Sequence, residues 1–306
     1  MTTSGVLRLG TRGSALALWQ AEHVAARLRA GSAVLRVELD VLSSRGDADR
    51  VTPLPEIGGK GVFTEHLEHA LRDGRIDLAV HSLKDLPVEP AKGLVLGAIL
   101  GRDDPRDVLV SRDGATLAAL PRGAVVGTSS TRRAAQLLAV RPDLEPRPIR
   151  GNVETRLEKV RNGTYDAAVL AAAGIARLGL AERITEFLPL DTFLPAPGQA
   201  ALAVQCRAED ERVRALLETI DEPGLRAATE AERAFLEWLG GGCAVPVAAL
   251  ATPDGGDGLV LDGWVGAPDG SRTIRRRGRG EATHAAALGI RLAEQALREG
   301  AAELLG

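Results

Sequence analysis

The sequence predicts an α/β protein of two similar lobes followed by a small α+β domain. Three observations indicate this class. Apolar strand-like segments alternate with helical patterns along most of the chain, a proline- and glycine-rich segment at 194–199 interrupts them, and hairpin-like segments follow Pro223. Such alternation favours mostly parallel sheets with helices on their faces. The length of 306 residues allows two or three domains at about 150 residues each.

The first lobe begins with a predicted strand at 6–9 and a helix for which Ser14 is the N-cap. The apolar residues of this helix recur at helical spacing, at Ala17, Ala21, Val24 and Leu28. Apolar segments at 35–42 and 76–80 predict two further strands, and 63–71 predicts a helix between them.

The same rhythm resumes after 101–105 and predicts a second lobe. Its expected strands are 108–110, 124–126, 146–149 and 167–170, and its expected helices begin at Thr131 and span 153–160. The segment 194–199 then leads into a strand-like segment at 201–205, which we expect to return to the first lobe. Two crossings between lobes would make a hinged cleft.

The remaining chain predicts a small antiparallel domain. A helix with Ala228, Ala231, Phe235 and Trp238 on one face precedes strands at 245–251, 259–265 and 272–277, joined by turn sequences, and a helix with Ile290, Ala293, Leu297 and Ala301 on one face ends the chain. We therefore expect lobe 1 at 1–101 and 198–219, lobe 2 at 102–197, and the third domain at 220–306.

Composition excludes several classes of protein. A net charge of -3 and 3% aromatic residues supply neither the basic field nor the stacking surface of a nucleic-acid binder. The longest apolar stretch, 167–176, is shorter than the roughly 20 residues that span a bilayer. Residues 1–10 lack a signal-peptide pattern, so we expect a cytoplasmic protein. Cys206 and Cys243 are too distant in sequence to suggest a disulfide framework or a metal site.

Arginine residues recur where a strand gives way to a helix. Arg12 and Ser14 lie at the first such junction, and 127–133 and 150–156 repeat the placement. A helix dipole disfavours a cation in the first turn by about 0.3–1 kcal/mol and favours an anion there. Backbone N–H groups, hydroxyls and guanidinium groups together bind carboxylates or phosphates. Composition alone explains any single arginine, but three repeats indicate a ligand with several carboxylates.

A second candidate site follows the strand at 76–80, where Lys84 and Asp85 lie in the sequence HSLKDLP. The carboxyl end of a strand in an α/β lobe opens toward the ligand. A carboxylate among many cations suits proton transfer or stabilisation of a transient positive charge on a substrate. The alternative is an ordinary charged pair on a loop.

A third candidate is Cys243, which follows three glycines at 240–242. Residues without side chains leave room for a bulky group beside the sulfur, and a thiolate there is a nucleophile or an attachment point. An inert buried thiol explains Cys243 equally well, and is the preferred interpretation of Cys206 in its apolar strand.

Other motifs are weaker. Residues 57–63 resemble a phosphate loop, but glycine follows Lys60 where serine or threonine is required, so we interpret them as a glycine lid that presents Lys60 and Phe63. His66 and His69 share a helix face without a third ligand, and no metal is expected. The arginines at 275–277 are most simply interpreted as a solvated strand edge.

Taken together, these motifs resemble hydroxymethylbilane synthases, also called porphobilinogen deaminases. The resemblance runs from about Arg8 to the C-terminal helix and rests on RLGTRGSALALWQ at 8–20, GGKG at 58–61, HSLKD at 81–85, GTSS at 127–130, RGN at 150–152 and GGC at 241–243. It implies two lobes of the periplasmic-binding-protein type around a cleft, plus a small α+β domain that carries the cysteine.

The resemblance also implies an activity. Members of the family condense four porphobilinogen molecules head to tail into the linear tetrapyrrole hydroxymethylbilane, and lose one ammonia at each addition, in haem and other tetrapyrrole biosynthesis. The chain grows on a dipyrromethane cofactor in thioether linkage, which Cys243 matches. Because each pyrrole carries an acetate and a propionate, cofactor and product are polycarboxylates, which accounts for the arginines.

Residue by residue, the resemblance makes Asp85 the catalytic carboxylate, which would hold pyrrole N–H groups and stabilise the cationic azafulvene formed when ammonia leaves. Lys60 and Phe63 match the lid. The positions that match cofactor or substrate binding are Arg12, Ser14, Lys84, Thr128, Ser129, Ser130, Arg132, Arg133, Arg150, Asn152, Arg156, Arg177 and Gln199. Ala200 departs from the pattern, since many members have glycine after the hinge glutamine.

The sequence thus favours a cytoplasmic, monomeric transferase that acts on porphobilinogen, without a metal, a membrane or a nucleic acid. The alternative is a two-lobed anion-binding protein with the same lobes and no turnover. The cysteine of the third domain distinguishes them, because a simple binding protein does not need a tethering thiol.

Overall fold

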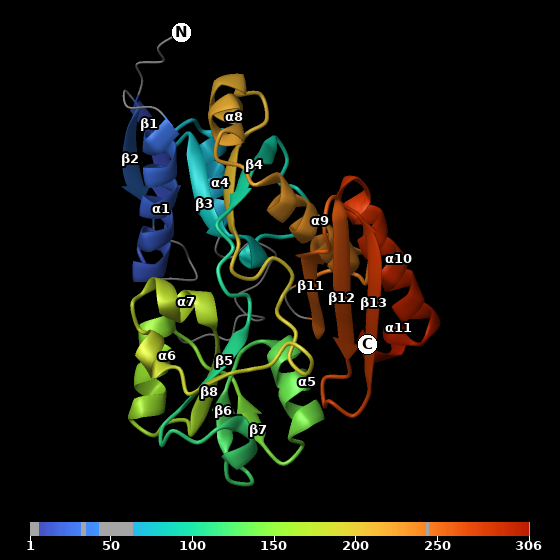
Figure 1. Cartoon of the computed structure of the whole chain (residues 1–306). Helices are drawn as coiled ribbons and strands as arrows, with labels where there is room; N and C mark the ends of the chain where they lie inside the picture. The colour runs from blue at the N-terminus through green and yellow to red at the C-terminus, as the bar shows by residue number, and fades with distance from the viewer. Residues whose placement is uncertain (1–5, 32–34, 43–63, 243–244, 306) are drawn as a thin grey trace. The chain divides into compact units, whose positions relative to one another are not determined.

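The structure is a computed structural model that describes residues 6–31, 35–42, 64–242 and 245–305. The chain divides into two compact units (Figure 1). Unit 1 comprises Met1–Arg102 and Ala201–Arg226, and unit 2 comprises Asp103–Ala200 and Ala227–Gly306. None of the helices in the described ranges is long and apolar enough to cross a membrane.

Unit 1 is built on a five-stranded sheet with the order β2-β1-β3-β10-β4. Its strands are β1 (Val6–Thr11), β2 (Arg36–Val41), β3 (Leu78–Ser82), β4 (Leu94–Leu100) and β10 (Leu202–Arg207). Its helices are α1 (Ala15–Gly31), α4 (Glu65–Arg72), the short η1 (Leu83–Asp85) and α8 (Glu211–Glu218). Apolar residues of α1 and α8 pack on one face of the sheet, and those of α4 pack in a separate cluster with Ile76 and Ala79.

The second sheet, in unit 2, repeats this plan with the order β7-β6-β8-β5-β9. Its strands are β5 (Asp107–Ser111), β6 (Val125–Gly127), β7 (Glu145–Arg147), β8 (Ala167–Ala171) and β9 (Glu186–Phe187). The helices around it are η2 (Leu117–Ala119), α5 (Thr131–Val140), α6 (Val153–Arg161), α7 (Ala172–Arg177) and η3 (Ala181–Arg183).

Both sheets are mostly parallel, as the sequence predicts. In each, three strands pair in parallel, and the fourth in order, β10 or β5, runs antiparallel to both of its neighbours. The fifth strand therefore runs in the common direction again. The two reversed strands are the ones that the chain enters after passing from one unit to the other.

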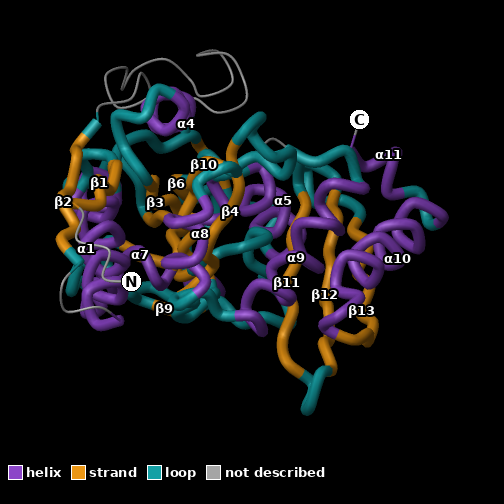
Figure 2. The backbone as a smooth tube through the Cα atoms, turned by 90° about the horizontal axis from the view of Figure 1, so that it is seen from above, coloured by secondary structure: helices purple, strands orange, loops and turns teal. Residues whose placement is uncertain are grey.

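The rest of unit 2 is a three-stranded antiparallel sheet with the order β11-β12-β13 (Figure 2). Its strands are β11 (Val247–Pro253), β12 (Gly258–Gly266) and β13 (Thr273–Glu281). Its helices are α9 (Pro223–Trp238), which enters unit 2 at Ala227, η4 (Ala282–His284), α10 (Ala285–Arg298) and α11 (Ala301–Leu305). A core of its own joins Phe235 of α9, Leu261 of β12 and Leu292 of α10. The two-lobed α/β fold with a three-stranded antiparallel sheet is therefore confirmed.

The opposite face of this small sheet packs on the second lobe. Leu250 and Trp264 share an apolar cluster with Ala135 of α5 and with Leu194. Arg275 pairs with Asp262 at 2.6 Å and also donates to the Leu190 and Asp191 carbonyls. Buried contacts and charges thus fix the small sheet to the second lobe.

The interpretation of 275–277 as a solvated strand edge is wrong for its first two arginines. Arg275 binds Asp262 and the Leu190 carbonyl, and Arg276 pairs with Glu299 of the segment after α10.

Several element bounds differ from those expected. The predicted strand at 76–80 begins two residues later than expected, at Leu78. Gly300, with φ of 93°, separates α10 from α11 within the predicted last helix. The sequence analysis missed β4, β9, α7 and α8.

Candidate functional site

Most of the candidate residues in the described ranges follow the carboxyl ends of the parallel strands in each sheet. In unit 1, Thr11 ends β1 and Ser82 ends β3, its neighbour. In unit 2, Gly127 ends β6 and Ala171 ends β8, which also pair in parallel. Because adjacent parallel strands end at one edge, the loops that follow them present their side chains together, as is usual for ligand sites in open α/β sheets.

The corner between β1 and α1 is held by hydroxyl groups. The Ala17 N–H donates to Ser14 Oγ at 3.3 Å, so Ser14 is the predicted N-cap. Thr11 Oγ1 donates to the Ala17 carbonyl at 3.0 Å. These bonds fix the backbone on both sides of Arg12, which is half-buried.

The segment that carries Lys84 and Asp85 is fixed from three sides. Gln20 of α1 donates from Nε2 to Ser82 Oγ at 2.8 Å, and the Leu83 N–H donates to the Ala201 carbonyl at 3.0 Å. The Leu83 side chain is fully buried in an apolar cluster with Ile99, Ala201 and Ala203. The neighbouring Asp85 side chain is exposed. A rigid segment therefore presents an accessible carboxylate.

The loop after β6 in unit 2 is a network of hydroxyl groups. Ser129 Oγ donates to the Ile149 carbonyl at 2.8 Å and accepts from the Ile149 N–H at 3.0 Å. Thr128 Oγ1 accepts from the Ser130 N–H at 3.2 Å, and Ser130 caps α5 by accepting from the Arg133 N–H. These bonds hold the loop close to the segment that follows β7.

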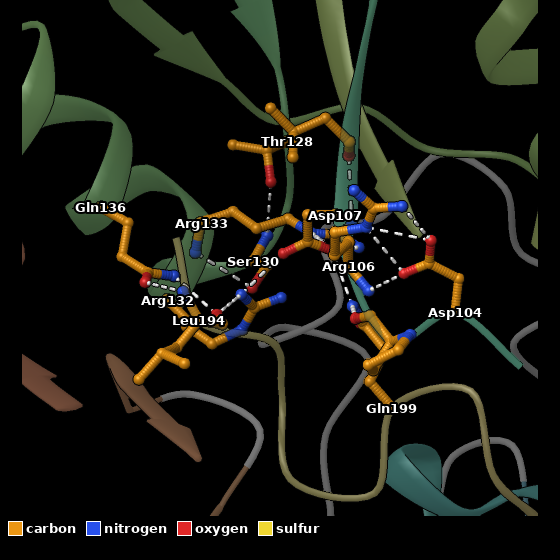
Figure 3. Close-up of polar contacts among 12 residues, drawn as sticks. Asp104, Arg106, Asp107, Thr128, Ser130, Arg132, Arg133, Gln136, Leu194 and Gln199 are labelled. Carbon is orange, nitrogen blue, oxygen red and sulfur yellow. Dashed lines mark hydrogen bonds and ion pairs between the residues drawn. The ribbon is translucent and has the colours of Figure 1, made fainter. Parts of the chain in front are cut away.

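Arg132 and Arg133 in the first turn of α5 converge on Asp107, the first residue of β5 (Figure 3). Arg132 Nη1 lies 2.7 Å from Asp107 Oδ2, and Arg133 Nη2 lies 2.6 Å from Oδ1. All three side chains are buried. The sequence analysis expected an external anion to compensate these arginines. That expectation is corrected in part, because a carboxylate of the chain compensates one of the two charges.

The cluster still fits an anionic ligand. Burial alone would raise the pKa of Asp107, but the two guanidinium groups outweigh burial and hold that pKa well below its usual range. Asp107 is therefore ionised, and two cations face one anion. Arg132 Nε is buried without a hydrogen-bond partner, and a buried N–H of this kind is costly unless a ligand satisfies it. The uncompensated positive charge and the unsatisfied N–H together suit a ligand that carries carboxylate groups.

The third junction, between β7 and α6, also has the expected cap. Asn152 Oδ1 accepts from the Thr155 N–H at 2.9 Å, and Arg156 Nε donates to the Gly151 carbonyl at 2.8 Å. Gly151 has φ of 110°, and a β-carbon there would lie 2.5 Å from a Thr155 methyl carbon, so glycine is required. The half-buried Arg150 lies directly before this turn.

Arg177 and Gln199 lie elsewhere. Arg177 donates from Nε to Asp103 at 2.8 Å and from Nη2 to the Ala200 carbonyl at 2.6 Å. Gln199 is fully buried and donates to the Pro105 carbonyl at 2.7 Å and to Asp107 at 2.8 Å. Both side chains therefore join the two segments that connect the units, and the ligand-binding role that the resemblance implies for them stays a prediction.

Lys60, Phe63 and Cys243 lie outside the described residues, so the expected lid and the expected attachment point stay predictions. Sequence reasoning missed Asp107 and Gln136. Asp107 had a visible signal, because a carboxylate opens an otherwise apolar strand. Gln136 lies four residues after Arg132 on α5, and its amide binds both the N–H and the carbonyl of Leu194.

This geometry defines a class: a two-lobed α/β protein in which hydroxyl groups, helix N-termini and guanidinium groups lie where strands end and helices begin, a combination that suits acidic ligands. Comparison with known proteins narrows the class. The family model for the dipyrromethane cofactor-binding domain of porphobilinogen deaminase matches residues 7–215, and the model for its C-terminal domain matches residues 227–298. The porphobilinogen deaminase of Brevibacillus brevis is 46% identical over 301 residues, which cover 98% of this chain and 97% of that protein.

Solved structures of similar fold include the VFT2 domain of Bordetella pertussis BvgS, with a TM-score of 0.43 and 18% identity over 70% of this chain and 86% of that one. The effector-binding domain of a BenM variant has a TM-score of 0.41 and 17% identity over 70% of this chain and 92% of that one.

The chain belongs to the porphobilinogen deaminase family. It is a transferase that deaminates porphobilinogen and condenses four molecules of it into hydroxymethylbilane, with dipyrromethane as its cofactor. The alternative of a non-catalytic anion-binding protein is therefore set aside.

Proposed function

We propose that Asp85 is the catalytic carboxylate of this transferase, and that the cations and hydroxyls at the two carboxyl edges bind the acetate and propionate groups of cofactor and substrate. The observation that carries the proposal is an exposed carboxylate on a rigid segment, at the same edge as Arg12 and Lys84. The proposed binding residues are Arg12, Ser14, Lys84, Thr128, Ser129, Ser130, Arg132, Arg133, Arg150, Asn152 and Arg156.

The proposed roles follow from charge. When bound, the cofactor supplies the pyrrole carbon onto which the product grows, tethered in our proposal at Cys243. The Asp85 carboxylate accepts hydrogen bonds from pyrrole N–H groups and stabilises positive charge that develops as ammonia leaves. Ser130 and Asn152 cap helix N-termini whose partial positive charge favours anions, and Arg132 offers a buried N–H.

Substitution of Asp85 tests this role. Asp85→Asn keeps the shape and removes the charge, so we expect ammonia release from porphobilinogen to fall by about a hundredfold or more, while the purified protein retains its cofactor. Asp73→Asn, another exposed aspartate of unit 1, is the control and should keep full activity. Normal ammonia release by Asp85→Asn would remove the proposed role.

We also propose three structural domains, with boundaries as expected from the sequence. The separate core of α9, α10 and the three-stranded sheet supports this division.

We further propose that the protein is a monomer and acts in the cytoplasm. The large apolar side chains exposed in the described ranges come from different elements, at Val6, Val41, Val140, Phe187 and Trp238, and Cys206 is a buried free thiol. Light scattering coupled to size exclusion tests the monomer.

A further inference from the structure

Each of the two connections between the units contains a left-handed residue. The first crossover, 101–106, starts at Gly101 with φ of 63°, and the second crossover, 188–201, has Gly198 and Ala200 near its end with φ of 73° and 71°. Within the described ranges, Ala200 is the one residue other than glycine with positive φ. Because a β-carbon makes this conformation unfavourable, neighbouring contacts must hold Ala200 in it.

Arg177 provides such a contact. Its guanidinium group binds the Asp103 carboxylate of the first crossover and the Ala200 carbonyl of the second, at 2.8 and 2.6 Å. The Arg177 side chain is 5% exposed and the Asp103 side chain is 52% exposed, so water reaches the carboxylate but hardly reaches the guanidinium group or its bond to the Ala200 carbonyl. One cation thus links both crossovers at the boundary of unit 2, which begins at Asp103 and reaches Ala200.

The residue after Ala200 contacts η1, the segment that carries Asp85. Ala201 belongs to unit 1, and its carbonyl accepts from the Leu83 N–H at 3.0 Å. Leu83 begins η1, which contains Lys84 and Asp85. Two successive carbonyls therefore have different anchors, Ala200 on Arg177 and Ala201 on η1. A rotation about Ala200 changes the direction of the Ala201 carbonyl, and with it the anchor of η1.

We propose that Arg177 is a positioning residue for the reaction: by holding Asp103 and Ala200 together it sets the backbone that anchors the segment carrying Asp85. The inference rests on the proposed role of Asp85. It differs from the role expected from the family resemblance, in which Arg177 binds a carboxylate of the cofactor or the substrate.

A double-mutant cycle separates the two roles. If Arg177 acts through Asp103, Arg177→Gln and Asp103→Ala each lower kcat by about tenfold or more, because small displacements of a catalytic group are costly. The KM for porphobilinogen stays within about twofold of the parent value in both variants. The double variant is then no slower than Arg177→Gln alone, because both changes break one contact. Arg106→Gln is the matched control, because Arg106 pairs with Asp104 in the same crossover and stacks on Phe187. We expect it to keep the parent kcat.

Cofactor content from intact mass and thermal melting accompany each assay, because a merely structural role changes these and not kcat alone. A raised KM with unchanged kcat in Arg177→Gln, together with parent kinetics in Asp103→Ala, would overturn the inference and assign Arg177 to ligand binding. Independent, additive losses would overturn it too. If Arg177→Gln does not fold, parent kcat in Asp103→Ala is sufficient to overturn it. Failure of the Asp85 proposal is distinguishable, because it appears in Asp85→Asn and leaves the coupling between Arg177 and Asp103 unchanged.

Discussion

At the scale of single residues, buried charge determines which arginines can serve a ligand. Arg132 and Arg133 share Asp107, so the pair keeps one uncompensated positive charge and one unsatisfied N–H. A buried ion pair stabilises the fold only when hydrogen bonds to its other donors and acceptors offset the cost of removing the charges from water. The unsatisfied group thus makes binding of an acidic ligand more favourable than a fully neutralised cluster would.

Another buried titratable residue is His81, which lies in β3 directly before Ser82 and η1. Burial is the main cause that lowers the pKa of His81 from 6.5 to about 4. A folded-state pKa below the unfolded value means that the unfolded chain takes up the proton first, so stability falls as the pH drops from about 6.5 to about 4. Above this window His81 is neutral in both states and contributes no pH dependence.

We therefore expect the free energy of unfolding to decrease by about 2–3 kcal/mol between pH 6.5 and pH 4 because of His81. Urea unfolding at several pH values measures this, and His81→Gln should flatten the decrease. The exposed His69 on α4 is the control, since His69→Gln should leave the decrease in place. An equal slope in parent and His81→Gln would contradict the assignment.

At the scale of elements, the candidate site depends on how strands end and helices begin. Ser14, Ser130 and Asn152 each accept a backbone N–H at the start of a helix. Two of these caps, at α5 and α6, precede arginines in the first turn or shortly after it. The sequence made this pattern visible, because capping residues and arginines are neighbours in the chain. The partners Asp103 and Asp107 come from other segments, and only the folded chain reveals them.

Ala200 permits a test at this scale. Replacing alanine by glycine normally costs roughly 0.5–1 kcal/mol through the greater freedom of the unfolded chain. At Ala200 the change also relieves a left-handed β-carbon, which offsets about 1 kcal/mol. We expect Ala200→Gly to be at least about 1 kcal/mol more stable than Ala196→Gly, made in the same crossover, by urea unfolding. Equal losses in the two variants would show that Ala200 is not strained.

At the scale of the whole molecule, the sequence predicted the fold well because its signals are local. Alternating strands and helices identified both lobes, and turn sequences identified the antiparallel sheet. Short elements such as β9, with two residues, carry too little periodicity to be recognised. β4 was missed because no helix separates its apolar segment, 94–100, from the first crossover, so it does not follow the alternation of strands and helices. The clamp from Arg275 to Asp262 and the Leu190 carbonyl joins segments distant in sequence, so no local pattern could reveal it.

The candidate site could be predicted less completely. Long motifs such as HSLKD and GTSS located most of its residues, but the contacts that decide their roles are tertiary. Arg177 illustrates this, because its position resembles that of a ligand-binding residue and its guanidinium group binds the two crossovers. The thiol that the sequence singled out, Cys243, was identified from its glycines and from the family resemblance.

The most direct test of the central claim, that carboxylate-binding edges and Asp85 extend an oligomer tethered at Cys243, is the intact mass of the protein mixed with a few equivalents of porphobilinogen. We predict that the parent carries the cofactor and gains discrete increments of one pyrrole unit each, that Asp85→Asn carries the cofactor without increments, and that Cys243→Ala carries neither. A parent chain that remains at its sequence mass, or an Asp85→Asn chain that elongates like the parent, would contradict the account.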